Sequence, residues 1–248
     1  MGLRRPGFSL YWTLGFPSLS SSLEIMDRLS TCADFLEVGI PSAKPIYDGP
    51  IVRETHRIAF SEIGGRLEPL KVLEGMDKPY TLLAYLDGLD RVGLRRLLET
   101  AASIGALCVL LPDLPFERPE MLNVYVGESL RAGLKPCFFA SSRFPHGWLT
   151  GYSELDPLYV YLGLQPATGV KLPVDVFKNV ALAKRLVGDT YLVAGFSVRS
   201  PSIARDLVKA GADGVVVGSA VIKKYVEDGL EPAARLACEI ASGLRRAA

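Results

Sequence analysis

Short apolar runs of strand length alternate with amphipathic helical stretches along this chain, and the alternation occurs eight times in 248 residues. Several runs are apolar on both faces, as parallel strands covered by helices are. Repeated strand and helix units of roughly 30 residues predict a parallel sheet, and eight such units predict a closed (β/α)8 barrel of the α/β class. A doubly wound open sheet is the alternative. The expected strands are residues 8–14, 35–39, 80–86, 106–111, 135–140, 158–162, 191–194 and 214–217.

The clearest helical patterns cover residues 22–31, 49–63, 91–103, 119–132, 173–187, 200–210 and 232–245. Three of them carry a proline near the first turn, where a missing N–H costs nothing. No linker, low-complexity tract or charge block divides the chain, so we expect residues 1–248 to form a single domain.

The composition restricts the class of partner. Lys and Arg number 28 against 27 Asp and Glu, which gives no electrostatic case for binding nucleic acid or an anionic membrane. The sequence has no long apolar run and no signal-sequence pattern, so we expect a soluble cytoplasmic protein. The four cysteines stand in apolar segments at no metal-like or disulfide-like spacing, and we expect small core residues in a reducing compartment.

Two carboxylates are expected at one end of the second strand. Glu37 lies within the apolar run 35–39, and Asp48 lies in the Pro- and Gly-rich loop that follows. Strand alternation puts Glu37 on the face of Gly39. Buried acids are costly and mark functional sites. The alternative is that Glu37 pairs with a core cation and that Asp48 only shapes its turn.

Glycine turns follow the last strands. Gly195 ends the seventh strand, and Gly218 and Ser219 lead from the eighth strand into a helical stretch, residues 221–227. Backbone N–H groups and a hydroxyl at a helix start suit a phosphate, and this end of a barrel commonly holds one. An ordinary helix cap is the alternative. A third glycine loop, which contains Thr168 and Gly169, is long enough to close over a ligand.

Several kinds of chemistry lack their residues. His56 and His146 are the only histidines, which is too few for a convincing metal site. No strand carries a lysine at its carboxyl end for a Schiff base, and no Gly-x-Gly-x-x-Gly follows the first strand. We therefore expect acid–base catalysis by carboxylates on a phosphorylated substrate, without a cofactor or metal.

Residues 35–50 read Phe-Leu-Glu-Val-Gly-Ile-Pro-Ser-Ala-Lys-Pro-Ile-Tyr-Asp-Gly-Pro, which resembles the signature of the tryptophan synthase α subunit family. Residues 11–17 resemble the family's first strand and turn, and later segments that include Gly195-Phe196 and Gly218-Ser219 fall in the family's order. The resemblance covers nearly the whole chain. Its strand-two motif is specific, whereas the Gly-Ser motif is shared by many barrels.

The resemblance implies a lyase of tryptophan biosynthesis that cleaves indole-3-glycerol phosphate to indole and glyceraldehyde 3-phosphate, in an α2β2 type complex with a β subunit. It also implies a role for each matching residue. Glu37 matches the general acid/base, Asp48 the acid that engages the indole N–H, and Thr168 the loop residue that closes onto Asp48. The residues that match the family's phosphate binders are Gly169, Gly195, Gly218 and Ser219. Tyr11 and Tyr161 match residues beside the indole ring.

The expected chemistry agrees with these roles. Cleavage needs indole C3 protonated and a proton taken from the side-chain hydroxyl, and one carboxyl can do both in turn. Burial should raise the pKa of Glu37, which favours its action as an acid. A second, ionised carboxylate near the ring nitrogen would stabilise the cation that forms.

The sequence departs from the family pattern at its loops. Lys44 stands where the family usually has an acid facing the partner, Ser42 replaces a common Phe, Phe16 replaces an Asp, and Ser197 replaces a Gly. We therefore expect an active but divergent α subunit whose partner loop is electrostatically changed by Lys44. The alternatives are another phosphate-binding barrel lyase or isomerase, and a mainly regulatory subunit.

Overall fold

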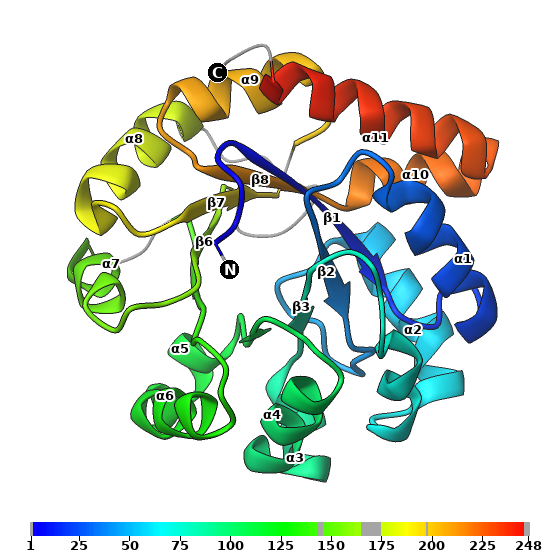
Figure 1. Ribbon diagram of the computed structural model, residues 1–248, viewed down its shortest axis with the longest axis horizontal. Coiled ribbons are helices and arrows are strands. Elements are labelled where there is room, and N and C mark those ends of the chain that lie inside the picture. The colour runs from blue at the N-terminus through cyan, green and yellow to red at the C-terminus, as the bar shows by residue number, and fades with distance from the viewer. Residues whose placement is uncertain (1, 143–145, 165–174, 197, 246–248) are drawn as a thin grey trace.

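All eight expected strands form, and they lie parallel in one sheet at the centre of the molecule (Figure 1). The computed structural model describes residues 2–142, 146–164, 175–196 and 198–245. The strands are β1 (Gly7–Thr13), β2 (Phe35–Gly39), β3 (Tyr80–Leu83), β4 (Val109–Leu110), β5 (Phe138–Ala140), β6 (Val160–Gly163), β7 (Leu192–Gly195) and β8 (Gly214–Val217).

The strand order is that of a barrel. It runs β4-β3-β2-β1-β8-β7-β6-β5, so the first and last strands of the chain are hydrogen-bonded neighbours. Only β4 and β5 lack a hydrogen-bonded partner on one side within the described residues. The expected (β/α)8 barrel is therefore confirmed as a nearly closed TIM barrel, and the open sheet is rejected.

Helices surround the barrel (Figure 1). Two expected helices differ from the sequence pattern. The stretch 91–103 is broken at Gly93, whose φ of 81° ends one helix and starts the next, and the stretch 119–132 opens with a 3-10 turn. The helices are α1 (Leu19–Ser30), α2 (Pro50–Ile63), α3 (Leu86–Val92), α4 (Leu94–Ser103), α5 (Leu114–Glu117), α6 (Leu122–Arg131), α7 (His146–Ser153), α8 (Val176–Val187), α9 (Pro201–Lys209), α10 (Ser219–Asp228) and α11 (Leu230–Arg245), with 3-10 helices at Glu68–Leu73 and Pro119–Met121.

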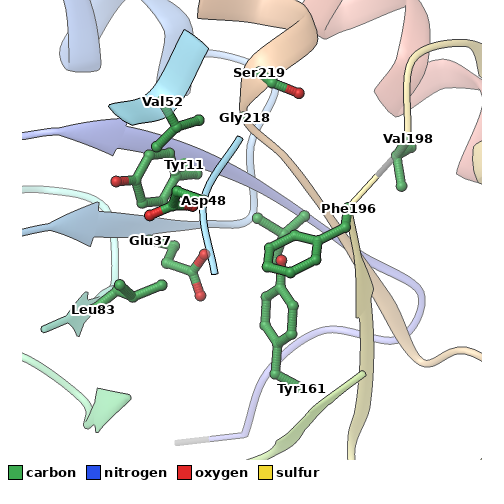
Figure 2. Close-up of a pocket in the computed structure, with 11 residues that line it drawn as sticks. Tyr11, Glu37, Asp48, Val52, Leu83, Tyr161, Phe196, Val198, Gly218 and Ser219 are labelled. Atoms are coloured by element: carbon green, nitrogen blue, oxygen red, sulfur yellow. The ribbon is translucent and has the colours of Figure 1, made fainter. Parts of the chain in front are cut away.

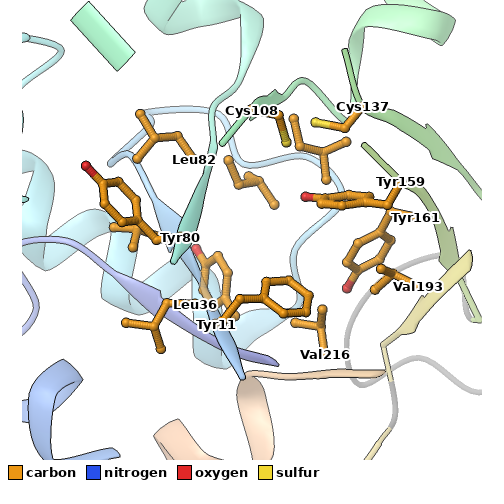
Figure 3. Close-up of a cluster of buried hydrophobic side chains, with 14 of the residues drawn as sticks. Tyr11, Leu36, Tyr80, Leu82, Cys108, Cys137, Tyr159, Tyr161, Val193 and Val216 are labelled. Atoms are coloured by element: carbon orange, nitrogen blue, oxygen red, sulfur yellow. The ribbon is translucent and has the colours of Figure 1, made fainter. Parts of the chain in front are cut away.

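The barrel interior is a packed core that also contains polar atoms. Every residue of the eight strands is buried, which explains why the strand segments are apolar on both faces. Figure 3 shows the rings of Tyr11, Tyr159 and Tyr161 among aliphatic side chains, beside the thiols of Cys108 and Cys137. The hydroxyl of Tyr159 lies 3.3 Å from the Thr81 hydroxyl, so the interior offers hydrogen-bonding groups below the functional end.

Two of the four cysteines differ from expectation. Cys32, just after α1, and Cys238, in α11, form a disulfide across 206 residues of chain, with Cα atoms 5.2 Å apart. The expectation of buried free thiols is correct for Cys108 and Cys137 only. The spacing gave no signal because the two residues meet only when α1 and α11 pack side by side on the outside of the barrel (Figure 1). None of the described helices is both long enough and apolar enough to span a membrane.

Candidate active site

A pocket opens at the carboxyl ends of the strands (Figure 2). Its space is about 390 Å³ when the open mouth is included. The structure brings six of the expected site residues together here, from the first, second, sixth and eighth strands and the segments that follow them. The lining residues are Tyr11, Glu37, Asp48, Val52, Leu83, Tyr161, Phe196, Val198, Val216, Gly218 and Ser219.

Glu37 enters the pocket from β2, in register between Tyr11 on β1 and Thr81 on β3. The residue is only 2 % exposed, and one carboxyl oxygen, Oε1, has no hydrogen-bond partner in the described part of the chain. Burial and, to a lesser extent, the charge of Asp48 raise the pKa of Glu37 to about 8, against the opposing effect of the Tyr159 hydroxyl. No ion pair to Glu37 forms among residues 2–142, 146–164, 175–196 and 198–245, so pairing with a core cation does not explain it there.

Asp48 is held at the end of a tight turn. Its backbone N–H donates to the Pro45 carbonyl at 3.1 Å, and α2 begins directly beyond Gly49. The Tyr85 hydroxyl donates to Oδ2 of Asp48 at 2.8 Å. Burial raises the pKa of Asp48 to about 7, while the Tyr85 hydroxyl and the charge of Arg53 lower it.

The two carboxyls therefore differ in protonation. Both have raised pKa values, and that of Glu37 is the higher because the charge of Asp48 adds to burial there, while a tyrosine hydroxyl lowers the pKa of each carboxyl. Near neutral pH, Glu37 holds a proton while Asp48 is the first to ionise. The pocket thus contains an acid and a carboxylate on the same side (Figure 2).

Aromatic rings form the opposite wall. The ring of Phe196 lies 5.8 Å from that of Tyr161 and 5.8 Å from that of Phe139, measured between centroids. Phe196 has a φ of 66°, a left-handed conformation that is uncommon outside glycine and that gathers at functional sites. Gly195 leaves room for this wall, because a Cβ there would lie 1.8 Å from the Tyr161 hydroxyl.

The expected phosphate end has two described components. Gly218 directly precedes α10, which begins at Ser219 without a side-chain cap and has its amino terminus at the pocket. Gly195 ends β7, next to Phe196. Thr168 and Gly169 lie outside the described residues, as does Ser197.

Sequence reasoning missed several side chains that support the pair of acids. They are Tyr85 and His56, which lie within reach of Asp48, and Tyr159, which lies below Glu37, together with Phe196 in the aromatic wall. The sequence signals available for them were a histidine within the helical stretch 49–63 and a tyrosine near the end of the apolar run 80–86. No group of three or more His, Cys, Asp or Glu side chains that could hold a metal occurs in the described ranges.

Comparison with known proteins identifies the family. The family model of the tryptophan synthase alpha chain matches residues 3–244. Among curated relatives, the tryptophan synthase alpha chain of Thermococcus kodakarensis is 33% identical, with 96% of each chain covered. That of Sulfurisphaera tokodaii is 31% identical, covering 91% of this chain and 92% of the relative.

Solved structures agree. The tryptophan synthase A-subunit from the hyperthermophile Pyrococcus furiosus superposes with a TM-score of 0.85 at 26% identity, covering 98% of this chain and 99% of that one. A chain of the tryptophan synthase complex from Pyrococcus furiosus gives a TM-score of 0.84 at 27% identity, with the same coverage. The chain therefore belongs to the tryptophan synthase alpha chain family, and it is a lyase of tryptophan biosynthesis that cleaves indole-3-glycerol phosphate.

Proposed function

We propose that Glu37 is the general acid and base of this cleavage and that Asp48 is the carboxylate that stabilises the indole ring as it becomes positive. The observation that carries the proposal is the pair of buried carboxyls in one pocket, Glu37 with an unpartnered oxygen among the described residues and Asp48 with the Tyr85 hydroxyl. A division between one protonated and one ionised carboxyl is how acid–base sites operate near neutral pH.

The reaction can be written with every proton placed. Protonated Glu37 gives its proton to indole C3, and the ring nitrogen, positive after this step, lies against the Asp48 carboxylate. The Glu37 carboxylate then takes the proton of the hydroxyl on the carbon attached to C3. The bond between that carbon and C3 breaks, its electrons return to the ring, and indole and the aldehyde leave while Glu37 holds a proton again.

The remaining residues bind the substrate. We propose that the indole ring lies between Tyr11 and Tyr161, with Phe196 completing the apolar wall. The phosphate would sit at the amino terminus of α10, on Gly218 and Ser219, with Gly195 nearby, where backbone N–H groups and the helix dipole favour an anion. The roles of Thr168 and Gly169, in closing onto Asp48 and holding the phosphate, remain predictions.

We further propose a β subunit as the partner, in an α2β2 type complex. The support is the match to a chain of the Pyrococcus furiosus tryptophan synthase complex. Lys44 is exposed on the loop that leads to Asp48, where a change of charge can act on a partner without touching the carboxyl pair. A cytoplasmic location also remains a prediction.

Replacing Glu37 by Gln tests the catalytic role. The substitution keeps the shape of the side chain but removes its titrating proton, so substrate should bind normally while turnover falls below about a tenth of the wild-type rate. Indole release from indole-3-glycerol phosphate measures the rate, with and without the β subunit. Glu54→Gln, at an exposed acid on α2, is the matched control and should keep full activity. A Glu37→Gln enzyme with more than about a tenth of the rate would show that another group transfers the proton.

A further inference from the structure

His56 is a fully buried histidine that the mechanism above does not use. It lies on α2 with an exposure of 0 %, and both ring nitrogens have partners. Nδ1 accepts the backbone N–H of Ser42 at 3.0 Å, and Nε2 lies 2.8 Å from the Tyr11 hydroxyl. The imidazole therefore links Ser42, near the start of the loop that carries Asp48, to Tyr11, whose ring lines the pocket.

His56 belongs to a chain of hydrogen bonds that has a backbone group at each end, and these two groups determine which atom donates in each bond. An amide N–H can only donate, so Nδ1 carries no proton and the neutral ring must carry its proton on Nε2. Nε2–H then donates to the Tyr11 hydroxyl, which leaves the Tyr11 proton for Thr13 at 3.1 Å.

The other end of the chain requires the same direction. The Thr13 hydroxyl donates to Thr55 at 2.7 Å, and the Thr55 hydroxyl donates to the Val52 carbonyl, also at 2.7 Å, which can only accept. Both ends are backbone groups of fixed polarity, and they agree. A protonated imidazole would direct Nδ1–H against the Ser42 N–H, so the chain excludes the charged form.

We propose that His56 is a positioning residue for Asp48, acting as a neutral imidazole that carries its proton on Nε2. The inference rests on the role proposed for Asp48 above. Nε2 lies 3.6 Å from Oδ2 of Asp48, the same oxygen that accepts a hydrogen bond from the Tyr85 hydroxyl. Through Ser42, His56 also fixes the beginning of the loop that carries Asp48, while α2 directly after the loop carries His56 itself.

The surroundings of His56 agree with a neutral ring. The titratable groups that face it are Tyr11 on β1, Asp48 on the loop, and Tyr85 and Asp87 at the start of α3. Burial lowers the pKa of His56 to about 4, although the charge of Asp87 opposes the shift. A neutral imidazole beside Asp48 does not cancel the charge of the carboxylate, which stays available for the positive indole ring.

Kinetics of a double-mutant cycle test the proposal. His56→Leu should lower kcat about tenfold or more with little change in KM, because the phosphate contacts remain and Thr13 still partners the Tyr11 hydroxyl while the carboxylate loses its position. The same substitution in an Asp48→Asn background should cause little further loss. His56→Gln, which keeps an N–H donor for Tyr11, should recover part of the rate. Additive losses from His56→Leu and Asp48→Asn would overturn the proposal.

A matched control separates positioning from stability. Ile63→Val shortens another fully buried side chain of α2 that takes no part in the chain of hydrogen bonds. It should lower Tm without changing kcat. If Ile63→Val and His56→Leu lower both Tm and kcat alike, His56 acts only through the packing of α2 and the proposal fails.

The tautomer has a direct readout that does not depend on activity. In 15N-labelled protein, the His56 imidazole should show a protonated Nε2 and an unprotonated Nδ1 from about pH 5 to about pH 9. A His146→Gln variant removes the only other histidine and so assigns the signals. A proton on Nδ1, or a titration in this range, would overturn the proposal. If instead Asp48→Asn keeps full activity, the role of Asp48 fails while the tautomer result still stands.

Discussion

Glu37 and Asp48 are both buried, and their neighbours determine the difference between the pKa values of the two carboxyls. Desolvation raises both pKa values because it disfavours the charged form of each acid. Asp48 receives the Tyr85 hydroxyl at 2.8 Å, whereas Oε1 of Glu37 has no partner in the described residues. The Tyr159 hydroxyl lowers the pKa of Glu37 as the Tyr85 hydroxyl lowers that of Asp48, so it is the added charge of Asp48 that makes Glu37 the carboxyl that keeps its proton.

This difference predicts the pH dependence of the reaction. Activity needs Asp48 ionised and Glu37 protonated, so kcat/KM should rise as pH passes about 7 and fall as pH passes about 8. In Tyr85→Phe the carboxylate loses its donor, the pKa of Asp48 rises, and the acidic limb of the profile should move to higher pH. Indole release measured across the pH range checks both limbs.

Tyr80→Phe is the control for this prediction. The Tyr80 hydroxyl is also buried, but it donates to the Ile104 carbonyl, away from the pocket. Its removal should leave the pH profile in place. An acidic limb that stays fixed in Tyr85→Phe would mean that a group other than Asp48 titrates there.

At the scale of the element, the apolar periodicity predicted most of the structure because strands and helices follow from local pattern. The expected strand 35–39 forms with those bounds. Glu37 could be predicted as a site residue from the sequence of this strand, and Asp48 from the loop after it. The run 106–111 was expected as a longer strand, and β4 covers Val109–Leu110 only. Leu107 and Cys108 also form backbone hydrogen bonds with β3, so the pairing begins before β4 does.

The parts of the site that were missed depend on contacts between elements. Phe196 becomes part of the wall through a left-handed φ that no local pattern announces. Tyr85 meets Asp48 across 37 residues of chain, and His56 meets Tyr11 across 45. Such pairings follow from the closure of the barrel, so a single sequence names the two acids but not the side chains that position them.

Gly195, at the end of β7, supports a prediction about the wall. In Gly195→Ala the new Cβ would meet the Tyr161 hydroxyl, a buried group that must then leave its place against Phe196. We expect kcat/KM to fall about tenfold or more, because the ring that flanks the indole is displaced. Steady-state kinetics, with Tm measured alongside, provide the test.

Gly127 offers a matched glycine. It lies within α6, and a Cβ there would meet nothing within 4 Å. Gly127→Ala should leave kcat/KM unchanged and stabilise the protein by about 0.5–1 kcal/mol, since alanine favours a helix interior. Equal kinetics for Gly195→Ala and Gly127→Ala would show that the position of Tyr161 does not matter for catalysis.

At the scale of the whole molecule, barrel closure brings the two ends of the chain together. β1 pairs with β8, and α11 packs against α1 and α9 (Figure 1). Two side-chain links join the region of α1 to α11. One is the disulfide between Cys32 and Cys238, and the other is an ion pair in which the Arg28 guanidinium donates two hydrogen bonds, of 2.7 and 2.5 Å, to the Glu231 carboxylate. Both members of the ion pair are exposed, so it contributes at most about 1 kcal/mol. The covalent link is the larger constraint.

The disulfide should account for a measurable share of the thermal stability. Closing a 206-residue loop restricts the unfolded chain and so stabilises the folded one. The chain-entropy model gives a stabilisation of about 5 kcal/mol for a loop of this length, whereas disulfides typically contribute about 2–4 kcal/mol. For a domain of this size, that range corresponds to a loss of roughly 4–16 °C in Tm on reduction. Disulfides are rare in reducing cytosol but common inside hyperthermophiles, so the number of free thiols in protein purified without reductant tests whether this bond forms.

Calorimetry with and without reductant measures this effect. The denatured oxidised protein should show two reactive thiols, from Cys108 and Cys137, and the reduced protein four. Cys32→Ser and Cys238→Ser should each have the lower Tm already, and reductant should not lower it further. Indole release at moderate temperature should be unchanged in all forms, because both cysteines lie on the outer helical layer, away from the pocket residues. Four reactive thiols in protein purified without reductant would show that the bond does not form, and the ends of the barrel would then be joined without a covalent link.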